Sequence, residues 1–281
     1  MKESGLTPLQ EALVNYDVSE LTGKAQTVLG PIDPEDLGVT SSHEHLFVDL
    51  SAMFAEPSEC TEKELAHQPV TLKNLWWVVY NPYRNLDNLL LRDEEVAITE
   101  ASFYKRAGGG TIVDVSTIGL GRDPLALASV AWATGLNVIM GSGYYVSATY
   151  SANIDGKTDE DISEEIMRDV WVGVGNTHIC AGIIGEIGCT WPLADSERKV
   201  LRAAAYAQQR TGAPLSIHPG RNPSAPLEII EILGKAGADI SRTVIGHVDR
   251  TLKDPEDRRK LAETGCYLEY DLFGLERYYP K

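Results

Sequence analysis

From residue 93 onward the chain alternates between amphipathic stretches and short, nearly continuous apolar runs. The amphipathic stretches have the spacing of helices, and the apolar runs have the length and composition of buried strands. Helices are expected over residues 93–107, 123–134, 159–174, 196–210, 226–236 and 254–263. Strands are expected over residues 111–117, 137–145, 180–188, 214–220, 243–249 and 266–273. Apolar strands separated by helices indicate a parallel sheet that is covered by helices.

The first third of the chain is less regular. Residues 1–23 are polar and are expected to form a loose N-terminal extension, with one domain over residues 24–281. Residues 25–32 have the pattern of a short strand, and a turn then leads into the strand that carries His43 and His45. A long connection over residues 51–92 contains prolines and a group of aromatic residues, for which helix packing is the expected role.

The number and spacing of the strands indicate a barrel. Seven strands follow one another from the His43 strand onward, and the later units recur at about 30 residues, the size of a β-α-β unit. This count is one strand short of a closed (β/α)₈ barrel. The alternative is an open doubly wound sheet, but that fold usually has a glycine-rich phosphate turn where this chain has His43-Glu44-His45. We therefore expect an α/β TIM (β/α)₈ barrel from which strand eight and the helix after it are missing.

Composition narrows the classes of partner and compartment. The 281 residues carry a formal net charge of −16, which disfavours nucleic acid and anionic membranes as partners, since both attract positive charge. No run approaches the roughly 20 apolar residues of a membrane span, and the first residues are too charged for a signal peptide. The four cysteines form no CxxC pair, so they indicate neither a disulfide framework nor a zinc knuckle. A reducing, cytoplasmic compartment is expected.

Metal-capable side chains fall at the ends of the predicted strands. His43 and His45 are two positions apart, so on a strand both imidazoles point to the same side. Glu186 lies within an apolar strand, and His218 and His247 end two later strands. In a barrel these strand ends surround one mouth, where the active sites of this fold lie. Because histidine is the commonest metal ligand, the pattern predicts a site for divalent cations.

Each of these residues also has a simpler interpretation. Two histidines on one strand can lie at the surface, and Glu186 can form a buried salt bridge with an arginine. Four strand-end histidines together with one apolar-flanked glutamate nevertheless favour the metal site. His67 and His178 fall outside the pattern and are expected at the surface.

Four motifs carry a family resemblance: TSSHEH at residues 40–45, GEIGC at 185–189, HPGR at 218–221 and GHVDR at 246–250. Together they resemble the phosphotriesterase-related proteins of the metal-dependent amidohydrolase superfamily, over about residues 23–275. The resemblance implies a TIM barrel with two divalent cations, usually zinc. By similarity His43 and His45 bind one ion, and Glu186 bridges it to the other. His218 and His247 hold that second ion.

The resemblance also implies an activity. In true phosphotriesterases the bridge is a carbamylated lysine, and the glutamate here points to a related branch that hydrolyses N-acetyltaurine and similar N-acyl amino acids. A small-molecule amide is thus the expected substrate, and Glu186 the centre of catalysis. Arg221 is expected to pair with an anionic tail, and Tyr144 and Tyr145 to line the pocket. A surface salt bridge and plain packing are the simpler roles for these three residues.

One family feature has no match in this sequence. The family's eighth strand carries an aspartate that binds metal and handles the proton of the attacking water. Asp249 and Asp271 are candidates to replace it, although each matches a family position of its own. Hydrolysis is therefore expected to be impaired. The alternatives are a phosphotriesterase or lactonase activity on the same metals, and a shortened form without catalysis.

Overall fold

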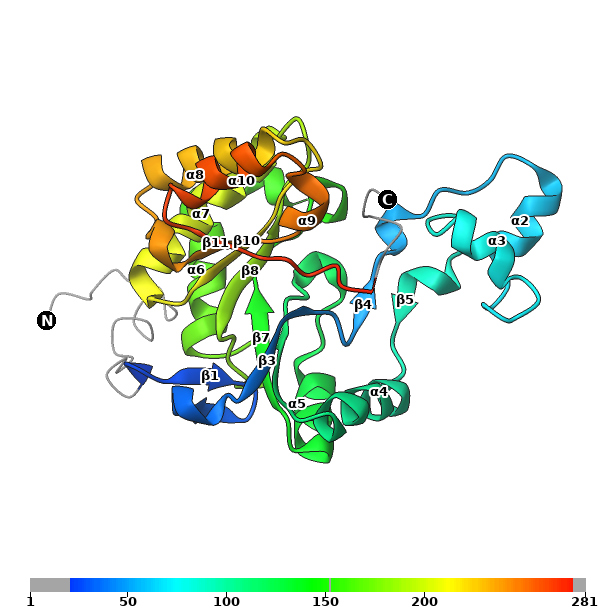
Figure 1. Cartoon of the computed structure of the whole chain (residues 1–281), viewed down its shortest axis with the longest axis horizontal. Coiled ribbons are helices and arrows are strands. Elements are labelled where there is room, and N and C mark those ends of the chain that lie inside the picture. Colours follow the sequence, from blue (N-terminus) through cyan, green and yellow to red (C-terminus); the bar gives the residue numbers. More distant parts are fainter. Residues whose placement is uncertain (1–20, 152, 275–281) are drawn as a thin grey trace, which may run out of the picture.

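A sheet of seven parallel strands forms the centre of the molecule (Figure 1). The structure is a computed structural model that describes residues 21–151 and 153–274. The strands are β3 (Val39–Glu44), β6 (Gly109–Asp114), β7 (Asn137–Ser142), β8 (Ile183–Gly188), β9 (Leu215–His218), β10 (Thr243–Ile245) and β11 (Tyr267–Leu268). Their order is β11-β10-β9-β8-β7-β6-β3, so each strand pairs with its neighbours in the series. Such consecutive parallel pairing is the topology of a TIM barrel.

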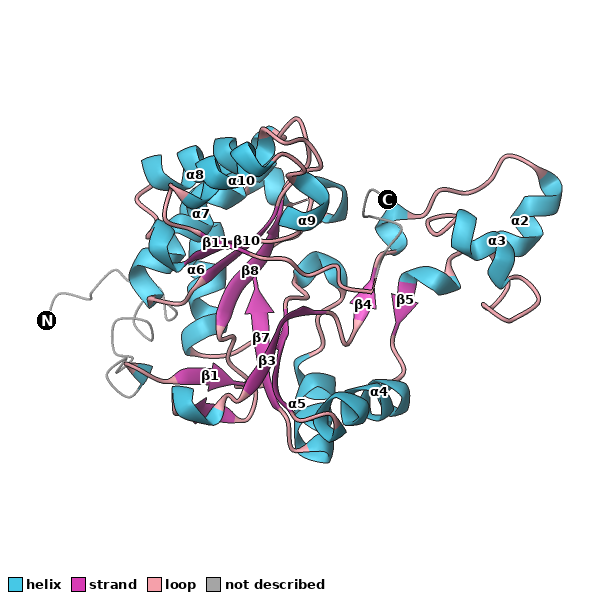
Figure 2. Ribbon diagram, in the orientation of Figure 1, coloured by secondary structure: helices cyan, strands magenta, loops and turns pink. Residues whose placement is uncertain are grey.

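Helices cover the outside of this curled sheet (Figure 2). They are α4 (Glu94–Arg106), α5 (Pro124–Thr134), α6 (Asp159–Trp171), α7 (Asp195–Thr211), α8 (Ala225–Lys235) and α10 (Pro255–Ala262). The short helix α9 (Val248–Thr251) instead follows His247 at the carboxyl end of β10. The expected α/β, TIM-like architecture is confirmed. The absence of strand eight and of the helix after it remains a prediction. Most of the expected extension over residues 1–23 lies outside the described residues. None of the helices in the described chain is long and apolar enough to cross a bilayer.

Helix boundaries follow from local capping. The side chains of Asp93, Asp123 and Thr158 accept hydrogen bonds from backbone N–H groups in the first turns of α4, α5 and α6. Gly135 and Gly212 end α5 and α7 in the left-handed conformation, which glycine adopts without a steric penalty. These signals account for five of the helix boundaries, and each of the six predicted helices matches an observed one to within three residues at either end.

The core divides between the two faces of the sheet. Side chains alternate along a strand, so successive residues join different clusters. Ile112 and Ile184 belong to the main core, which also contains the buried faces of the covering helices. Val113 and Ile183, one position along, belong to a smaller cluster on the other face. Both faces are thus apolar, as the continuous hydrophobic runs predicted.

Two predicted strands are interrupted. Residues 25–32 form an antiparallel hairpin of β1 (Ala25–Thr27) and β2 (Gly30–Ile32) rather than one strand. Residues 243–249 leave the strand conformation after Ile245, and His247 has a φ of 54°, in the left-handed region. His247 is the N-cap residue of α9, which starts immediately after it.

Residues 48–92 build a small lobe beside the sheet (Figure 1). It contains β4 (Val48–Asp49), α2 (Cys60–Ala66), α3 (Leu75–Tyr80) and β5 (Leu90–Leu91). Trp77 is buried against Ala66 and Val78, as helix packing requires. Trp76 is 64% exposed, so the packing role expected for it is wrong: the next position on a helix faces a different side.

Glu197 on α7 joins the loops that follow β7 and β8. Its buried carboxylate accepts hydrogen bonds from the backbone N–H groups of Ser147, Thr190 and Ala194 at 2.9, 2.9 and 3.1 Å. The Thr190 hydroxyl donates a further bond to it at 2.7 Å. Both loops lead away from the strand ends that carry the candidate site, so Glu197 holds the walls of that site together.

Replacing Glu197 with alanine should lower the free energy of unfolding by about 3 kcal/mol, because several buried N–H groups lose their acceptor. Glu197→Gln keeps one oxygen acceptor and should lose less. Urea unfolding followed by circular dichroism measures both variants. A loss below about 0.5 kcal/mol in Glu197→Ala, no more than a typical surface substitution, would show that the loops hold without this carboxylate.

Candidate metal centre

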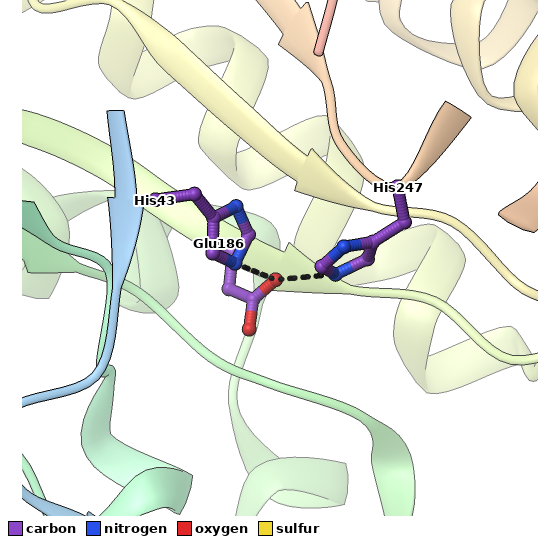
Figure 3. A group of neighbouring side chains, drawn as sticks. All are labelled: His43, Glu186 and His247. Carbon is purple, nitrogen blue, oxygen red and sulfur yellow. Dashed lines mark ion pairs between the residues drawn. The ribbon is translucent and has the colours of Figure 1, made fainter. Parts of the chain in front are cut away.

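Glu186 lies at the centre of a cluster of four histidines. Its side chain is only 1% exposed, on the central strand β8. Figure 3 shows His43 and His247 on opposite sides of its carboxylate, with Nε2 atoms 3.3 and 3.5 Å from Oε2. His218 Nδ1 lies 3.0 Å from the same oxygen. His45 Nε2 lies 3.3 Å from the other oxygen, Oε1.

The five predicted residues are thus brought together, but their division differs from the expected one. Three histidines share Oε2 and one faces Oε1, whereas the resemblance implied two on each side. The rings of His43 and His247 are 4.7 Å apart between centroids, closer than the 5.5 Å that separates His43 from His45. His43 on β3 and His45 immediately after it therefore both point toward Glu186, but they face different oxygens of its carboxylate.

Glycines on either side of Glu186 allow its strand to pack closely against the neighbouring backbone. Gly185 precedes it with a φ of +121°, and a Cβ there would lie 2.2 Å from the carbonyl oxygen of Ser216 on β9. Gly188 follows, and its Cβ would lie 2.3 Å from the backbone of Tyr145. Only glycine permits such approaches, which explains the Gly-Glu-Ile-Gly pattern around the buried acid.

Two carboxylates after β11 hold the outer nitrogens of the histidines. Glu269 Oε2 lies 3.1 Å from His43 Nδ1. Asp271 Oδ1 lies 2.8 Å from His247 Nδ1, and its Oδ2 accepts the His247 backbone N–H at 2.9 Å. A carboxylate on one ring nitrogen fixes the proton there and directs the lone pair of the other nitrogen inward. His43 and His247 are thereby oriented toward Glu186.

Sequence reasoning missed Glu269 altogether and considered Asp271 only as a replacement for the family aspartate that binds metal and handles the proton. The available signal was their spacing, two positions apart at the end of a predicted strand, as for the first histidine pair. The contact between His43 and Glu269 also joins β3 to the segment after β11, the two edge strands of the sheet. The sheet therefore curls until its edges approach one another at the site.

The charges in the cluster depend on each other. Burial alone would raise the pKa of Glu186, but its attraction to the surrounding histidines and the hydrogen bonds that they donate lower it well below its usual value. Burial lowers the pKa of His218 to about 4, so its ring is neutral and can offer a lone pair. Although burial opposes it, Glu186 and Glu269 raise the pKa of His43 well above its usual value. A cation at His43 would therefore displace a proton.

The residues fit a divalent cation. Imidazole nitrogens and carboxylate oxygens are the donors that zinc accepts. His43 Nε2 is buried and has no hydrogen-bond partner, as expected of a ligand atom. The simpler interpretation of Glu186 finds no support, because its ion pairs in the described chain are with histidines and none is with an arginine.

A cleft of about 650 Å³ opens beside His218 and is lined by two of the predicted substrate contacts, Tyr145 and Arg221. The Tyr145 hydroxyl lies 3.3 Å from His218 Nδ1. The prediction for Tyr144 is corrected: its side chain is 3% exposed, and its hydroxyl bonds Glu165 and Lys157 on the side of α6. Adjacent residues of an extended segment point to opposite sides, so only one of the two tyrosines can reach the cleft.

The remaining candidates lie apart from the cluster or have other partners. His67 and His178 are exposed, as expected. Asp249 accepts the backbone N–H groups of Arg250 and Leu272. Asp271 bonds His247 and also lies 3.4 Å from His43 Nδ1. Burial would raise the pKa of its carboxyl, but hydrogen bonds from His247 hold that pKa below the usual value. Both aspartates therefore act as positioning groups in this arrangement.

Comparisons with known proteins give a consistent result. The sequence model of the phosphotriesterase family matches residues 23–281. The N-acetyltaurine hydrolase of Xenopus tropicalis is 50% identical over 260 residues, which are 92% of this chain and 74% of that protein. The N-acetyltaurine hydrolase of Homo sapiens is 46% identical with the same coverage.

Solved structures show the same fold. A resiniferatoxin-binding protein from Rhodobacter sphaeroides superposes with a TM-score of 0.87 and 35% identity, over 90% of this chain and 71% of that one. A lactonase from Listeria monocytogenes superposes with a TM-score of 0.73 and 26% identity, over 92% and 74% of the two chains.

The cluster should bind divalent cations, and Glu186→Gln should lower metal content more than any single histidine substitution, because its two oxygens face different histidines. Elemental analysis of zinc-incubated, dialysed protein measures this, with the exposed His178→Gln as control. No metal in the wild type, or equal losses across His43, His45, Glu186, His218 and His247, would contradict a bridging role.

Glu269→Gln should weaken zinc affinity about 10- to 100-fold, because His43 loses the carboxylate that orients its ring. Competition with a chelating dye measures the affinity. Glu263→Gln on the surface is the matched control and should bind zinc as the wild type does. If both variants retain wild-type affinity, the Glu269 contact has no part in metal binding.

Proposed function

The chain belongs to the phosphotriesterase family, and on that premise we propose that it hydrolyses the amide bond of N-acetyltaurine and related N-acyl amino acids. Enzymes of this family are metal-dependent hydrolases with a binuclear centre. The substrate is proposed from the 46–50% identity to N-acetyltaurine hydrolases across most of the chain.

The single observation that carries a hydrolytic function is the buried carboxylate of Glu186, faced by imidazole nitrogens at both oxygens. We infer that the five residues hold two cations, with zinc as the expected metal. These residues are His43, His45, Glu186, His218 and His247. Such a pair of cations supplies an activated water near neutral pH and polarises the carbonyl of the substrate.

The protein's own side chains contribute binding and orientation. Glu269 and Asp271 keep His43 and His247 turned toward the reacting centre. Tyr145 places a hydroxyl beside His218, within reach of a polar group of the substrate. Arg221 in the same cleft is proposed to bind the anionic tail. The cleft also contains apolar side chains, which can exclude water from the amide.

A lactonase or phosphotriesterase activity on the same centre is the second candidate. It is favoured by the superposition on the Listeria monocytogenes lactonase, whose fold extends over most of this chain. A lactone or neutral phosphotriester lacks an anionic tail, so it gains nothing from a cationic cleft. The proposed cytoplasmic location and the single domain over residues 24–281 remain predictions, the former supported by the four free cysteines.

The zinc-loaded chain should release acetate from N-acetyltaurine with a kcat/KM at least about 10-fold above that for a lactone or a neutral phosphotriester, because a site built for a polar group discriminates strongly against analogues without it. Enzymatic detection of acetate and a spectrophotometric ester assay compare the substrates. Faster turnover of the lactone would favour the second candidate, and absence of acetate release would overturn the proposal.

A further inference from the structure

Arg250 is a partly buried cation that touches the histidine cluster and has no carboxylate partner at ion-pair distance in the described chain. It lies on α9, three residues after His247. Its Nη2 donates to His218 Nε2 at 2.9 Å and to the Pro219 carbonyl at 3.5 Å. Buried charges are normally paired with an opposite charge. A partly buried guanidinium that contacts a histidine instead of a carboxylate is therefore unusual.

Most of its hydrogen-bonding capacity is unused. A guanidinium offers five N–H donors, and the bonds found in the described chain involve Nη2. Its Nε is buried without a hydrogen-bond partner. Arg250 nevertheless lines two cavities, so a ligand that brings oxygen acceptors to its accessible N–H groups gains charge-assisted hydrogen bonds there.

The surroundings are locally cationic on an acidic protein. Arg250 and Arg221 together line both the cleft beside His218 and an adjoining cavity of about 520 Å³, where Lys253 adds a third positive charge. The two carboxylates of that cavity have other partners. Asp254 accepts the N–H of Glu256 at 2.9 Å, and Asp257 lies 3.6 Å from Lys260.

Arg221 lies close enough to Arg250 to disfavour its positive charge. Burial and the neighbouring charge of Arg221 both lower the pKa of Arg250. Two like charges held close together with one of them partly buried are stabilised by an anion that contacts both. An oxyanion with two or three oxygens matches the donors of two guanidinium groups.

We propose that Arg250 and Arg221 form the seat for the anionic group of the substrate, with Arg250 setting the preference for sulfonate- or carboxylate-tailed amides. Because Arg250 contacts His218 directly, an anion on its free donors places an amide two carbons away beside the histidine cluster. The choice of substrate in this inference rests on the proposed amide hydrolysis. Binding of the anion itself can be measured without turnover.

Steady-state kinetics test the seat on the zinc-loaded full chain. N-acetyltaurine is compared with N-ethylacetamide, which keeps the amide and lacks the sulfonate. Arg250→Met should raise KM for N-acetyltaurine at least about 10-fold, as expected for a desolvated charge pair, with kcat within about threefold. Its kcat/KM for N-ethylacetamide should fall by a much smaller factor than its kcat/KM for N-acetyltaurine, because loss of the contact with His218 affects both substrates alike. Arg221→Met should show a smaller rise, and Arg250→Lys should recover part of the loss.

The matched control is Arg259→Met, which removes the same charge from an exposed arginine paired with Glu256 and Glu263 on the surface. It should leave both substrates unaffected. Thermal melting confirms that the variants fold. If Arg250→Met does not fold, Arg250→Lys decides: a KM for N-acetyltaurine raised at least about threefold supports the seat, and an unchanged KM overturns it.

Equilibrium binding of ethanesulfonate at constant ionic strength separates the seat from catalysis. Binding by the wild type and by Arg259→Met that is at least about 10-fold weaker in Arg250→Met supports the seat, even if N-acetyltaurine is not hydrolysed and the proposed function fails. Equal ethanesulfonate affinity in Arg250→Met and Arg259→Met overturns it. So does an unchanged KM for N-acetyltaurine in Arg250→Met, which would leave the hydrolase function standing.

Discussion

A carboxylate buried in an apolar strand must be compensated, and the compensation of Glu186 organises the carboxyl ends of the sheet. Glu186 lies on β8, the central strand, and its partners come from both directions: His43 and His45 from β3, His218 and His247 from β9 and β10. Mutual attraction lowers the pKa of the acid although burial opposes this. Loss of one partner from such a buried charged group is strongly destabilising, so the members of the cluster depend on one another.

The same requirement links the edges of the sheet. His43 needs a partner for its second ring nitrogen, and Glu269 provides it from the segment after β11, 226 residues away in the chain. Asp271 serves His247 in the same way. The carboxylates that follow β11 therefore contribute both to the curl of the sheet and to the orientation of the two histidines. Glu197 joins the loops that follow β7 and β8 through hydrogen bonds. Arg221 and Arg250 line the cleft beside the histidine cluster and make it cationic. Substrate binding and reaction are thus assigned to adjacent surfaces.

Much of this could be read from the sequence, because periodicity and strand-end positions depend on local rules. The alternation of helices and apolar strands gave the architecture, and the histidines at successive strand ends gave the cluster. The features that could not be predicted depend on how the backbone turns and side chains are oriented in three dimensions. The left-handed turn at His247, the inward position of Tyr145 and the outward one of Tyr144 follow from tertiary packing that no local pattern encodes. Glu269 and Arg250 were missed because their roles exist only against partners from other strands.

Anomalous X-ray diffraction from crystals of the zinc-loaded chain tests the central claim most directly, because it locates the cations without reference to activity. The account predicts two peaks, one on each side of the Glu186 carboxylate and each about 2.0–2.2 Å from one of its oxygens. It also predicts that Glu269 and Asp271 remain on the outer nitrogens of their histidines. A single peak that touches only one oxygen, or peaks held by exposed residues such as His67 with the cluster empty, would contradict it.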